Sequence, residues 1–294
     1  MKIERDAPNS KRGYLNEDFQ LFNLKDQRNI EFGFHHHDFN KIIIFISGNA
    51  TYLIEGKAYK LKPWDILFVS SSEVHKPIID YSIPYERIVI WVNSRFLEKH
   101  NSDDCNLLAS FELAVKRKFN MLRLNSELLV NIKHILFNLE EECKSSEFGS
   151  CILKNSLILQ LLVSLNRLYM GMENNSGISG IEYDENIGDI LDYINKNISE
   201  ELSIDNLASW FYMSKYYLMH KFKKQTGYTI HNYILQKRLI MANLLIKQGK
   251  SIMQACAECG FEDYSSFFRA FKKMFGLSPK KHYKELKEIE KLLQ

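Results

Sequence analysis

The stretch LSIDNLASWFYMSKYYLMHKFKKQTG, Leu202 to Gly227, returns in altered form as KSIMQACAECGFEDYSSFFRAFKKMFG, Lys250 to Gly276. Phe222-Lys223-Lys224 recurs 49 residues later as Phe271-Lys272-Lys273, and the closing glycine recurs at the same separation. The opening Ser-Ile pair recurs at 48, so the second stretch has one additional residue near its middle. A recurrence of this kind predicts two copies of one supersecondary unit.

Each copy has the pattern of a helix, a tight turn and a second helix. Ser203 and Ser251 stand where a hydroxyl would accept from the free amides of a first helix, and Ser214 and Asp263 can cap the second helices. Gly260 permits the positive backbone angle that a sharp turn requires, and Gly227 and Gly276 are placed to end the second helices. The sequence therefore predicts two helix-turn-helix units.

A long helix is expected between the two units. Thr229–Lys247 is an unbroken helical pattern of 19 residues, roughly 28 Å long at about 1.5 Å per residue. That length is close to the ~34 Å between successive major-groove faces of a duplex. Ser278-Pro279 predicts the start of a last helix at about 279–292.

The charges are distributed unevenly along the chain. Residues 203–294 hold 16 Lys and Arg against 7 Asp and Glu, whereas residues 1–202 hold 23 against 29. The formal charge of +3 thus divides into +9 and −6. A basic domain suits a polyanion, because neutralising phosphates releases condensed counterions. A charged surface that only keeps the protein soluble would give the same count.

The two units and the segments that close the second one resemble the DNA-binding domain of AraC/XylS-family transcription regulators. The closing segments are Gly260-Phe261, Phe271-Lys272-Lys273, Phe275-Gly276 and Ser278-Pro279. The resemblance covers 187–294 and implies double-stranded DNA as a partner, with each second helix in a major groove. It also implies RNA polymerase as a partner and favours an activator over a repressor.

The family's DNA-contacting positions are carried over by this resemblance. The expected base contacts are Tyr216, Met219 and His220 in the first unit and Tyr264, Ser265 and Arg269 in the second. Arg269 can bond guanine in bidentate fashion, whereas the first set is unusually apolar, so readout of DNA shape can contribute there. The expected phosphate contacts are Ser214, Lys215, Lys221, Lys224, Ser266, Lys272 and Lys273. Each lysine can equally serve solubility alone.

The acidic half changes to alternating patterns with turn signals between them. The alternation predicts short strands at Lys41–Ile46, Thr51–Glu55, Ala58–Leu61, Asp65–Ser70 and Tyr85–Val92. Evenly spaced short strands of this kind favour a small barrel or sandwich.

Three histidines in this half, His35, His37 and His75, suggest a metal site, because His-x-His on a strand places two imidazoles on one face. The stretch Phe34–Pro77 is similar to a cupin barrel. Metal-binding cupins carry a Glu where this chain has Lys41, and an ammonium repels a divalent cation. We therefore expect no metal and no cofactor, and an effector pocket built from His35, His37, Lys41 and His75. Ordinary packed histidines remain the alternative.

Two helical runs follow between Asn125 and Met170. Leu129, Ile132, Leu136 and Leu139 form one apolar stripe, and a second stripe consists of Leu153, Leu157, Leu161, Leu165 and Leu168. The family resemblance implies that this pair of helices forms a homodimer interface. The alternative is that the stripes only cover the barrel.

The expected architecture is therefore multidomain α and β. It consists of a cupin-like, ligand-sensing β-barrel at 1–124, a helical dimerisation segment at 125–170, a linker at 171–186 and an all-α double helix-turn-helix domain at 187–294. The charged N-terminus and the absence of a membrane-spanning apolar run favour a cytoplasmic protein without a membrane partner. Five scattered cysteines favour reduced thiols, and the CxxC of Cys256 and Cys259 lacks the second pair that zinc would require.

These features predict a sequence-specific transcription regulator that responds to a small-molecule effector and has no catalytic residues. Two alternatives stay open. One is a metal-dependent cupin enzyme, an isomerase or dioxygenase, with an appended DNA-binding domain. The other is a DNA-binding regulator that senses no ligand.

Overall fold

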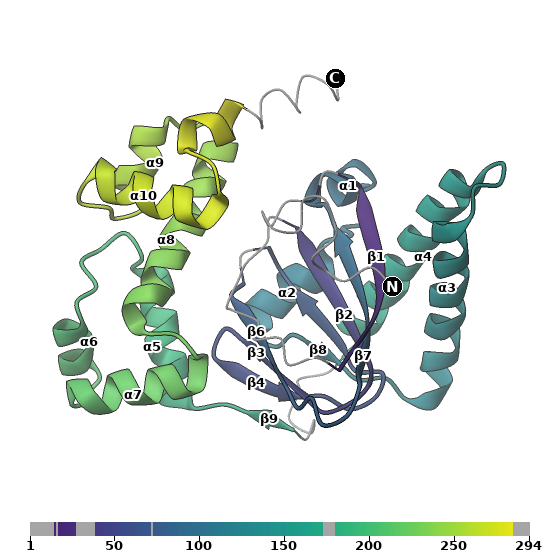
Figure 1. The fold of residues 1–294 in the computed structure, drawn as a ribbon, viewed down its shortest axis with the longest axis horizontal. Helices are drawn as coiled ribbons and strands as arrows, with labels where there is room; N and C mark the ends of the chain where they lie inside the picture. Colours follow the sequence, from purple (N-terminus) through teal and green to yellow (C-terminus); the bar gives the residue numbers. More distant parts are fainter. Residues whose placement is uncertain (1–14, 16, 28–38, 72, 173–179, 285–294) are drawn as a thin grey trace. The chain divides into compact units, whose positions relative to one another are not determined.

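The computed structural model describes residues 15, 17–27, 39–71, 73–172 and 180–284 (Figure 1). The chain divides into two compact units, Met1–Ile54 with Ala58–Glu182, and Tyr183–Gln294 with Glu55–Lys57. The first unit is β-rich and the second is helical, as the sequence predicts.

The first unit is built on two sheets. The larger has strand order β1-β7-β2-β5-β8 and the smaller β6-β3-β4-β9. The strands are β1 (Phe19–Asp26), β2 (Asn40–Ser47), β3 (Ala50–Ile54), β4 (Lys57–Lys60), β5 (Ile66–Val69), β6 (His75–Ile79), β7 (Tyr85–Val92), β8 (Met121–Leu122) and β9 (Ile181–Glu182). The five predicted strands correspond to β2, β3, β4, β5 and β7, whereas β1, β6 and the short strands β8 and β9 were not predicted.

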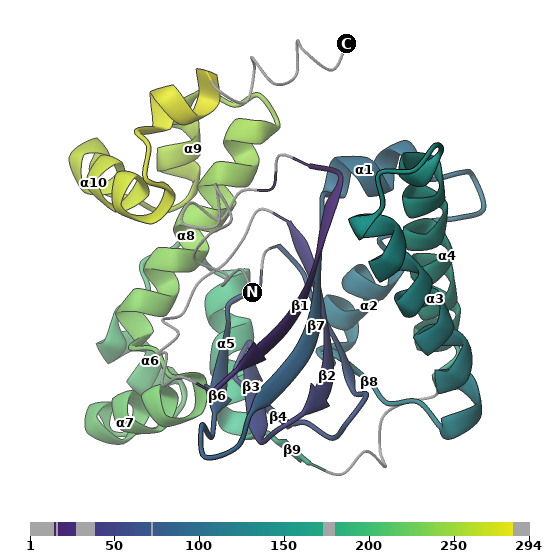
Figure 2. The same ribbon diagram turned by 45° about the vertical axis from the view of Figure 1, so that its right-hand side comes forward.

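Helices cover one face of the larger sheet (Figure 2). They are α1 (Ser94–Lys99), α2 (Ala109–Arg117), α3 (Ser126–Lys144) and α4 (Ser150–Met170). The Phe68 ring on β5 lies with its centroid 5.7 Å from that of Phe111 on α2 and 5.1 Å from that of Tyr169 on α4. By length and composition alone α4 could cross a membrane. Its Leu161, Leu165 and Tyr169 side chains are buried in the core of this unit.

The apolar stripes of α3 and α4 serve this core. Ile132, Leu136 and Leu139 are buried on α3, and Leu161 and Leu165 are buried on α4. The two helices pack against each other as an antiparallel pair (Figure 2). Most of each stripe therefore packs inside the first unit, as expected if the stripes cover the barrel. The homodimer interface implied by the family resemblance stays a prediction.

The second unit consists of six named helices and a further helical turn. The helices are α5 (Glu185–Lys196), α6 (Ile204–Trp210), α7 (Lys215–Thr226), α8 (Ile230–Lys247), α9 (Ile252–Glu258) and α10 (Tyr264–Phe275). The long central helix α8 begins after its N-cap Thr229 and ends at the predicted residue. Helical structure resumes at Pro279, and the predicted remainder of that helix beyond 284 lies outside the described residues.

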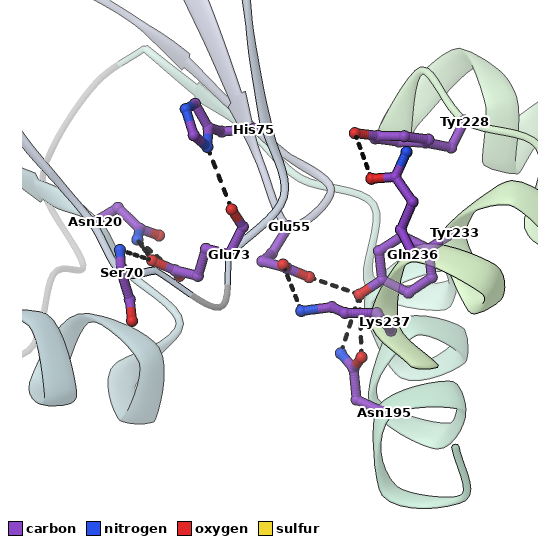
Figure 3. A network of polar contacts seen from close by, with 10 residues as sticks. All are labelled: Glu55, Ser70, Glu73, His75, Asn120, Asn195, Tyr228, Tyr233, Gln236 and Lys237. Atoms are coloured by element: carbon purple, nitrogen blue, oxygen red, sulfur yellow. Dashed lines mark hydrogen bonds and ion pairs between the residues drawn. The ribbon is translucent and has the colours of Figure 1, made fainter. Parts of the chain in front are cut away.

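A buried polar contact joins the first helix of this unit to the central one. The side chains of Asn195 on α5 and Tyr233 on α8 exchange hydrogen bonds of 3.1 and 3.2 Å (Figure 3). Because Tyr233 is 1% exposed, this pairing satisfies its hydroxyl inside the core and fixes α5 against α8.

Candidate DNA-binding and effector sites

The first helix-turn-helix unit is formed by α6 and α7. The Ser203 hydroxyl accepts from the Asn206 amide at 3.1 Å, and the Ser214 hydroxyl accepts from the Tyr217 amide at 3.2 Å. These caps start the two helices where the sequence predicts. Gly227, at φ +77°, ends α7 in the left-handed conformation that glycine adopts without strain. The helix boundaries thus follow from side-chain chemistry local to each end.

The second unit, formed by α9 and α10, repeats this construction. Ser251 and Gln254 form a reciprocal capping box at the start of α9. The Asp263 carboxylate accepts from the Ser266 amide at 2.7 Å and caps α10. Gly276, at φ +73°, ends that helix. The internal repeat in the sequence therefore corresponds to a structural repeat.

Helix α7 has one face buried in the core of the second unit and another face exposed to solvent. Leu218 and Phe222 are fully buried and turn that face of the helix into the core. The predicted base contacts Tyr216, Met219 and His220 are all exposed, and Tyr216 is 78% accessible. The structure brings these three together on the outer side of α7.

Helix α10 has the same division. Its buried residues are Phe267, Phe271 and Phe275, whereas Tyr264, Ser265 and Arg269 are exposed. Arg269 donates from its guanidinium to the Ser266 hydroxyl at 3.3 Å, a contact that orients the side chain along the outer surface. A guanidinium held this way keeps donors available for a partner.

The predicted phosphate contacts fall into two groups. Lys224, Lys272 and Lys273 are exposed near the ends of the two recognition helices, and Ser214 and Ser266 are exposed near their starts. Two lysines have partners in this structure. Lys215 forms an ion pair with Asp205, and the Lys221 ammonium lies 2.8 Å from the Asp184 carboxylate. The hydrogen bond to Asp184 raises the pKa of Lys221 above its usual value.

Asp184 was not predicted from the sequence as a residue of this site. Besides pairing with Lys221, it accepts from the Ile187 amide and caps α5. Its position directly before Glu185 and an apolar run is an ordinary N-cap signal, and that signal would have found it. Lys221 is thereby paired with the residue that caps α5, whereas Lys224, Lys272 and Lys273 are exposed.

Two of the four residues predicted to form the effector pocket, Lys41 and His75, lie among the described residues. His35 and His37 lie outside the described residues. Lys41 on β2 pairs directly with Trp91 on β7, so their side chains share one face of the larger sheet. Phe68, which packs under the helices, lies on the opposite face. Lys41 is 5% exposed and faces away from the helices.

The same interior receives His75 from the smaller sheet. Tyr85 shares the Trp91 face of β7, and its hydroxyl lies 2.9 Å from that of Tyr52 on β3. His75 pairs with Ile54, two residues along from Tyr52, and so shares the inner face of β3 and β6. Lys41 and His75 therefore lie on the inner faces of the larger and the smaller sheet, and the hydroxyl groups of Tyr52 and Tyr85 join these two faces.

Further polar groups unforeseen from the sequence border this interior. The Arg87 guanidinium on β7 lies 2.7 Å from the Asp26 carboxylate on β1 and 4.4 Å from the centre of the Tyr85 ring. Arg87 is 3% exposed. The ion pair with Asp26 thus places a charged group in the interior of this unit.

A hydrogen-bonded network holds the loop that leads into β6 (Figure 3). The buried Glu73 carboxylate accepts from the Ser70 amide at 2.8 Å and from the Asn120 side chain at 2.9 Å. The Glu73 carbonyl lies 3.2 Å from Nδ1 of His75. Since Asn120 also donates to the Phe68 carbonyl, the network fixes His75 relative to β5.

The described His, Cys, Asp and Glu side chains bear on the metal site suggested by the sequence. No cluster of three or more His, Cys, Asp and Glu side chains capable of holding a metal occurs among the described residues. Cys256 and Cys259 are buried thiols of the second unit's core, and burial raises the pKa of Cys259 to about 12. A thiol with that pKa is a poor source of the thiolate that zinc requires.

Comparison with known proteins gives two family matches. Residues 24–162 match an AraC-like ligand binding domain, and residues 207–285 match a helix-turn-helix domain. The chain is 26% identical over 260 residues to the HTH-type transcriptional activator RhaR of Pectobacterium atrosepticum, covering 88% of each chain. It is 24% identical over 254 residues to the activator RhaS of Escherichia fergusonii, covering 84% of this chain and 85% of that protein.

Proposed function

Because this chain belongs to the AraC family of transcription regulators, we propose that it activates transcription from promoters it selects by inserting α7 and α10 into adjacent major grooves. The observation that carries this proposal is the matched construction of the two helices. Each helix buries one apolar face, exposes three side chains predicted to contact bases, and has at least one exposed lysine near its end.

The predicted base contacts on α7 and on α10 differ in the kind of interaction that they can make with DNA. Arg269 presents a planar fork of donors suited to the O6 and N7 acceptors of guanine. Tyr216 and Met219 offer apolar surface for thymine methyl groups, and His220 offers a single ring edge for hydrogen bonding. The second unit therefore contributes most of the hydrogen-bonded specificity, and the first contributes apolar contact and fit to groove shape.

Phosphate contacts fix the protein on the duplex without reading its sequence. Lys224, Lys272 and Lys273 serve this role from the ends of the recognition helices. Lys215 can do so after exchanging Asp205 for a phosphate, whereas Lys221 reaches phosphate only by leaving Asp184. We rank Lys221 below the others for this reason.

The first unit binds the effector between its two sheets. Lys41, His75 and the buried Arg87 line this interior together with the Tyr52 and Tyr85 hydroxyls, which suits a small polar molecule. His35 and His37 complete the predicted pocket. The effector shifts the population between two arrangements of the DNA-binding units, and it does so in proportion to its difference in affinity for them.

A homodimer is formed through the outer surface of α3 and α4. Exposed apolar side chains occur on these helices and on the loop between them, and all except Leu153 lie outside the predicted stripes. The dimer surface comprises Val130, Phe137, Phe148, Ile152 and Leu153. Exposed apolar area of this kind on paired helices is typical of an interface between protein chains.

The regulator works in the cytoplasm, where its DNA lies, contacts RNA polymerase at the promoter and catalyses no reaction. Genome-wide mapping of the sites bound by the full chain, followed by expression analysis of the adjacent genes, tests the proposal. Transcripts that fall when the protein is deleted support an activator, whereas transcripts that rise identify a repressor. A thermal-shift screen of sugars, organic acids and metals tests the effector, and stoichiometric iron, zinc or manganese in the purified protein would favour the cupin enzyme instead.

A further inference from the structure

Arg238 lies in the middle of α8, between the two helix-turn-helix units. Its guanidinium donates to three backbone carbonyls, those of Ile198 at 2.9 Å, Glu200 at 2.6 Å and Gly260 at 2.6 Å. Ile198 and Glu200 lie in the segment that leads from α5 into α6. Gly260 lies in the turn between α9 and α10. One side chain thus bonds to the segment that leads into the first helix-turn-helix unit and to the turn inside the second.

The chemistry of this contact is specific to arginine. The guanidinium is planar and presents its donors in fixed directions, whereas an ammonium donates from a single point on a flexible stem. Among the described residues no carboxylate lies within ion-pair distance of Arg238, so its partners are the carbonyl dipoles. Burial lowers its pKa from the usual value. A partly buried cation that bonds only to backbone stabilises one relative placement of the segments it joins.

Gly260 leaves the room that this contact needs. A Cβ built at Gly260 would lie 2.7 Å from the Ser199 carbonyl oxygen and 2.9 Å from a guanidinium nitrogen of Arg238. The residue also has φ +75°, which glycine adopts without strain. Its equivalent in the first unit's turn is Tyr212, at φ +52°. The second turn therefore has a steric need for glycine that the first turn does not share.

We infer that Arg238 is a positioning residue that sets the spacing and rotation of α7 relative to α10, and thereby the separation of the two half-sites that the protein accepts on DNA. This inference rests on the proposed function. Two binding elements held rigidly gain affinity when their sites match in spacing, and they lose it when the sites are displaced. Without the arginine, each recognition helix keeps its own contacts while the coupling between them weakens.

The test uses the full chain and the duplex that the wild-type protein selects from a random library. Affinity is measured for this duplex, for versions with one or two base pairs inserted between the half-sites, and for a version with one half-site scrambled. The variants are Arg238→Gln, Arg238→Lys and Gly260→Ala, the last of which disturbs the same contact from the opposite side. Ile234→Val, a mild core truncation on the same helix, is the control for reduced stability.

We expect the insertions to weaken wild-type binding by about tenfold or more, and to weaken binding by the Arg238 and Gly260 variants by less than about threefold. On the scrambled duplex, wild type and variants bind alike. The inference is overturned if the variants keep the wild-type insertion penalty, or if they lose affinity equally on every duplex, which would reduce the arginine to a stabilising role. A wild-type protein without salt-dependent duplex affinity would instead refute the proposed function.

Discussion

The imidazole Nε2 of His282 lies 2.7 Å from the side-chain oxygen of Asn243, inside the core of the second unit. His282 is 2% exposed, and its ring stacks on Phe275 with centroids 5.5 Å apart. Because Asn243 presents an oxygen, Nε2 of the imidazole carries the hydrogen and donates it. Burial, followed by the positive charge of Lys247, lowers the pKa of His282 to about 4.

This contact predicts a loss of stability in mild acid. The unfolded chain binds a proton at His282 below about pH 6.5, whereas the folded chain does not until about pH 4, so the free energy of unfolding falls as the pH drops through this window. The loss reaches roughly 2–3 kcal/mol at its lower end. Urea unfolding of the full chain at pH 7.5 and 5.0 measures it. His282→Gln should be less stable than the wild type at pH 7.5, and its free energy of unfolding should fall less between pH 7.5 and 5.0. An equal fall in both proteins would contradict the lowered pKa of His282.

Tyr212 has a left-handed backbone conformation and a side chain that lies in solvent. Its φ is +52°, and its side chain is 97% exposed. Tyr212→Gly should raise the free energy of unfolding by roughly 0.5–1 kcal/mol, because relief of the left-handed strain outweighs the added freedom of the unfolded chain. Thermal unfolding measures the change. Gly260→Ala, in the corresponding turn of the second unit, should lower the midpoint temperature of unfolding. A shift of both variants in the same direction would refute this account of the two turns.

Lys273 is exposed at the end of α10 and is assigned to a phosphate. Lys273→Ala should weaken binding to every duplex by a similar factor and reduce the slope of log affinity against log salt by about 1. Fluorescence anisotropy at several salt concentrations gives both quantities. Lys247→Ala, which removes a charge from the end of α8, is the control. A sequence-dependent loss for Lys273→Ala would mean that this lysine contacts bases.

Val130 and Phe137 are seven positions apart on α3 and are 67% and 64% exposed. This spacing puts them on one outer face of the helix. Phe137→Glu should convert the dimer to a monomer in analytical ultracentrifugation without lowering the unfolding temperature, because the side chain contributes little to the monomer's core. Leu244→Glu, at a 53% exposed position on α8, should leave the dimer intact. A dimer that survives Phe137→Glu would place the interface elsewhere.

The sequence predicted those features that depend on local chemistry. The repeat, the serine and aspartate caps and the closing glycines gave the helix-turn-helix units, because each acts within a few residues of itself. The strand β7 was predicted from Tyr85 to Val92 because its apolar run is bounded by turn signals. In contrast, β1 was not predicted, because its burial does not alternate regularly and its end is polar. Strand β6 was not predicted either; it begins at His75, which was interpreted as a possible ligand.

Features that depend on distant partners were not predicted. The stripes on α3 and α4 correctly indicated buried faces, but periodicity does not say whether the covering surface belongs to the same chain. Arg238 resembled an ordinary charged residue of an amphipathic helix. Its three partners are backbone carbonyls, which every residue has, so the sequence contains no signal for them. The same holds for Arg87 with Asp26, which are 61 residues apart.

The central claim is that exposed side chains of α7 and α10 read DNA sequence, and it is tested most directly at Arg269. The measurement compares the duplexes selected from a random library by wild type and by Arg269→Ala, together with their affinities. We predict a loss of about 1–3 kcal/mol on the wild-type site and relaxed preference confined to one base pair, normally guanine. Unchanged preference at every position, or no duplex selection by the wild-type chain, would contradict the account.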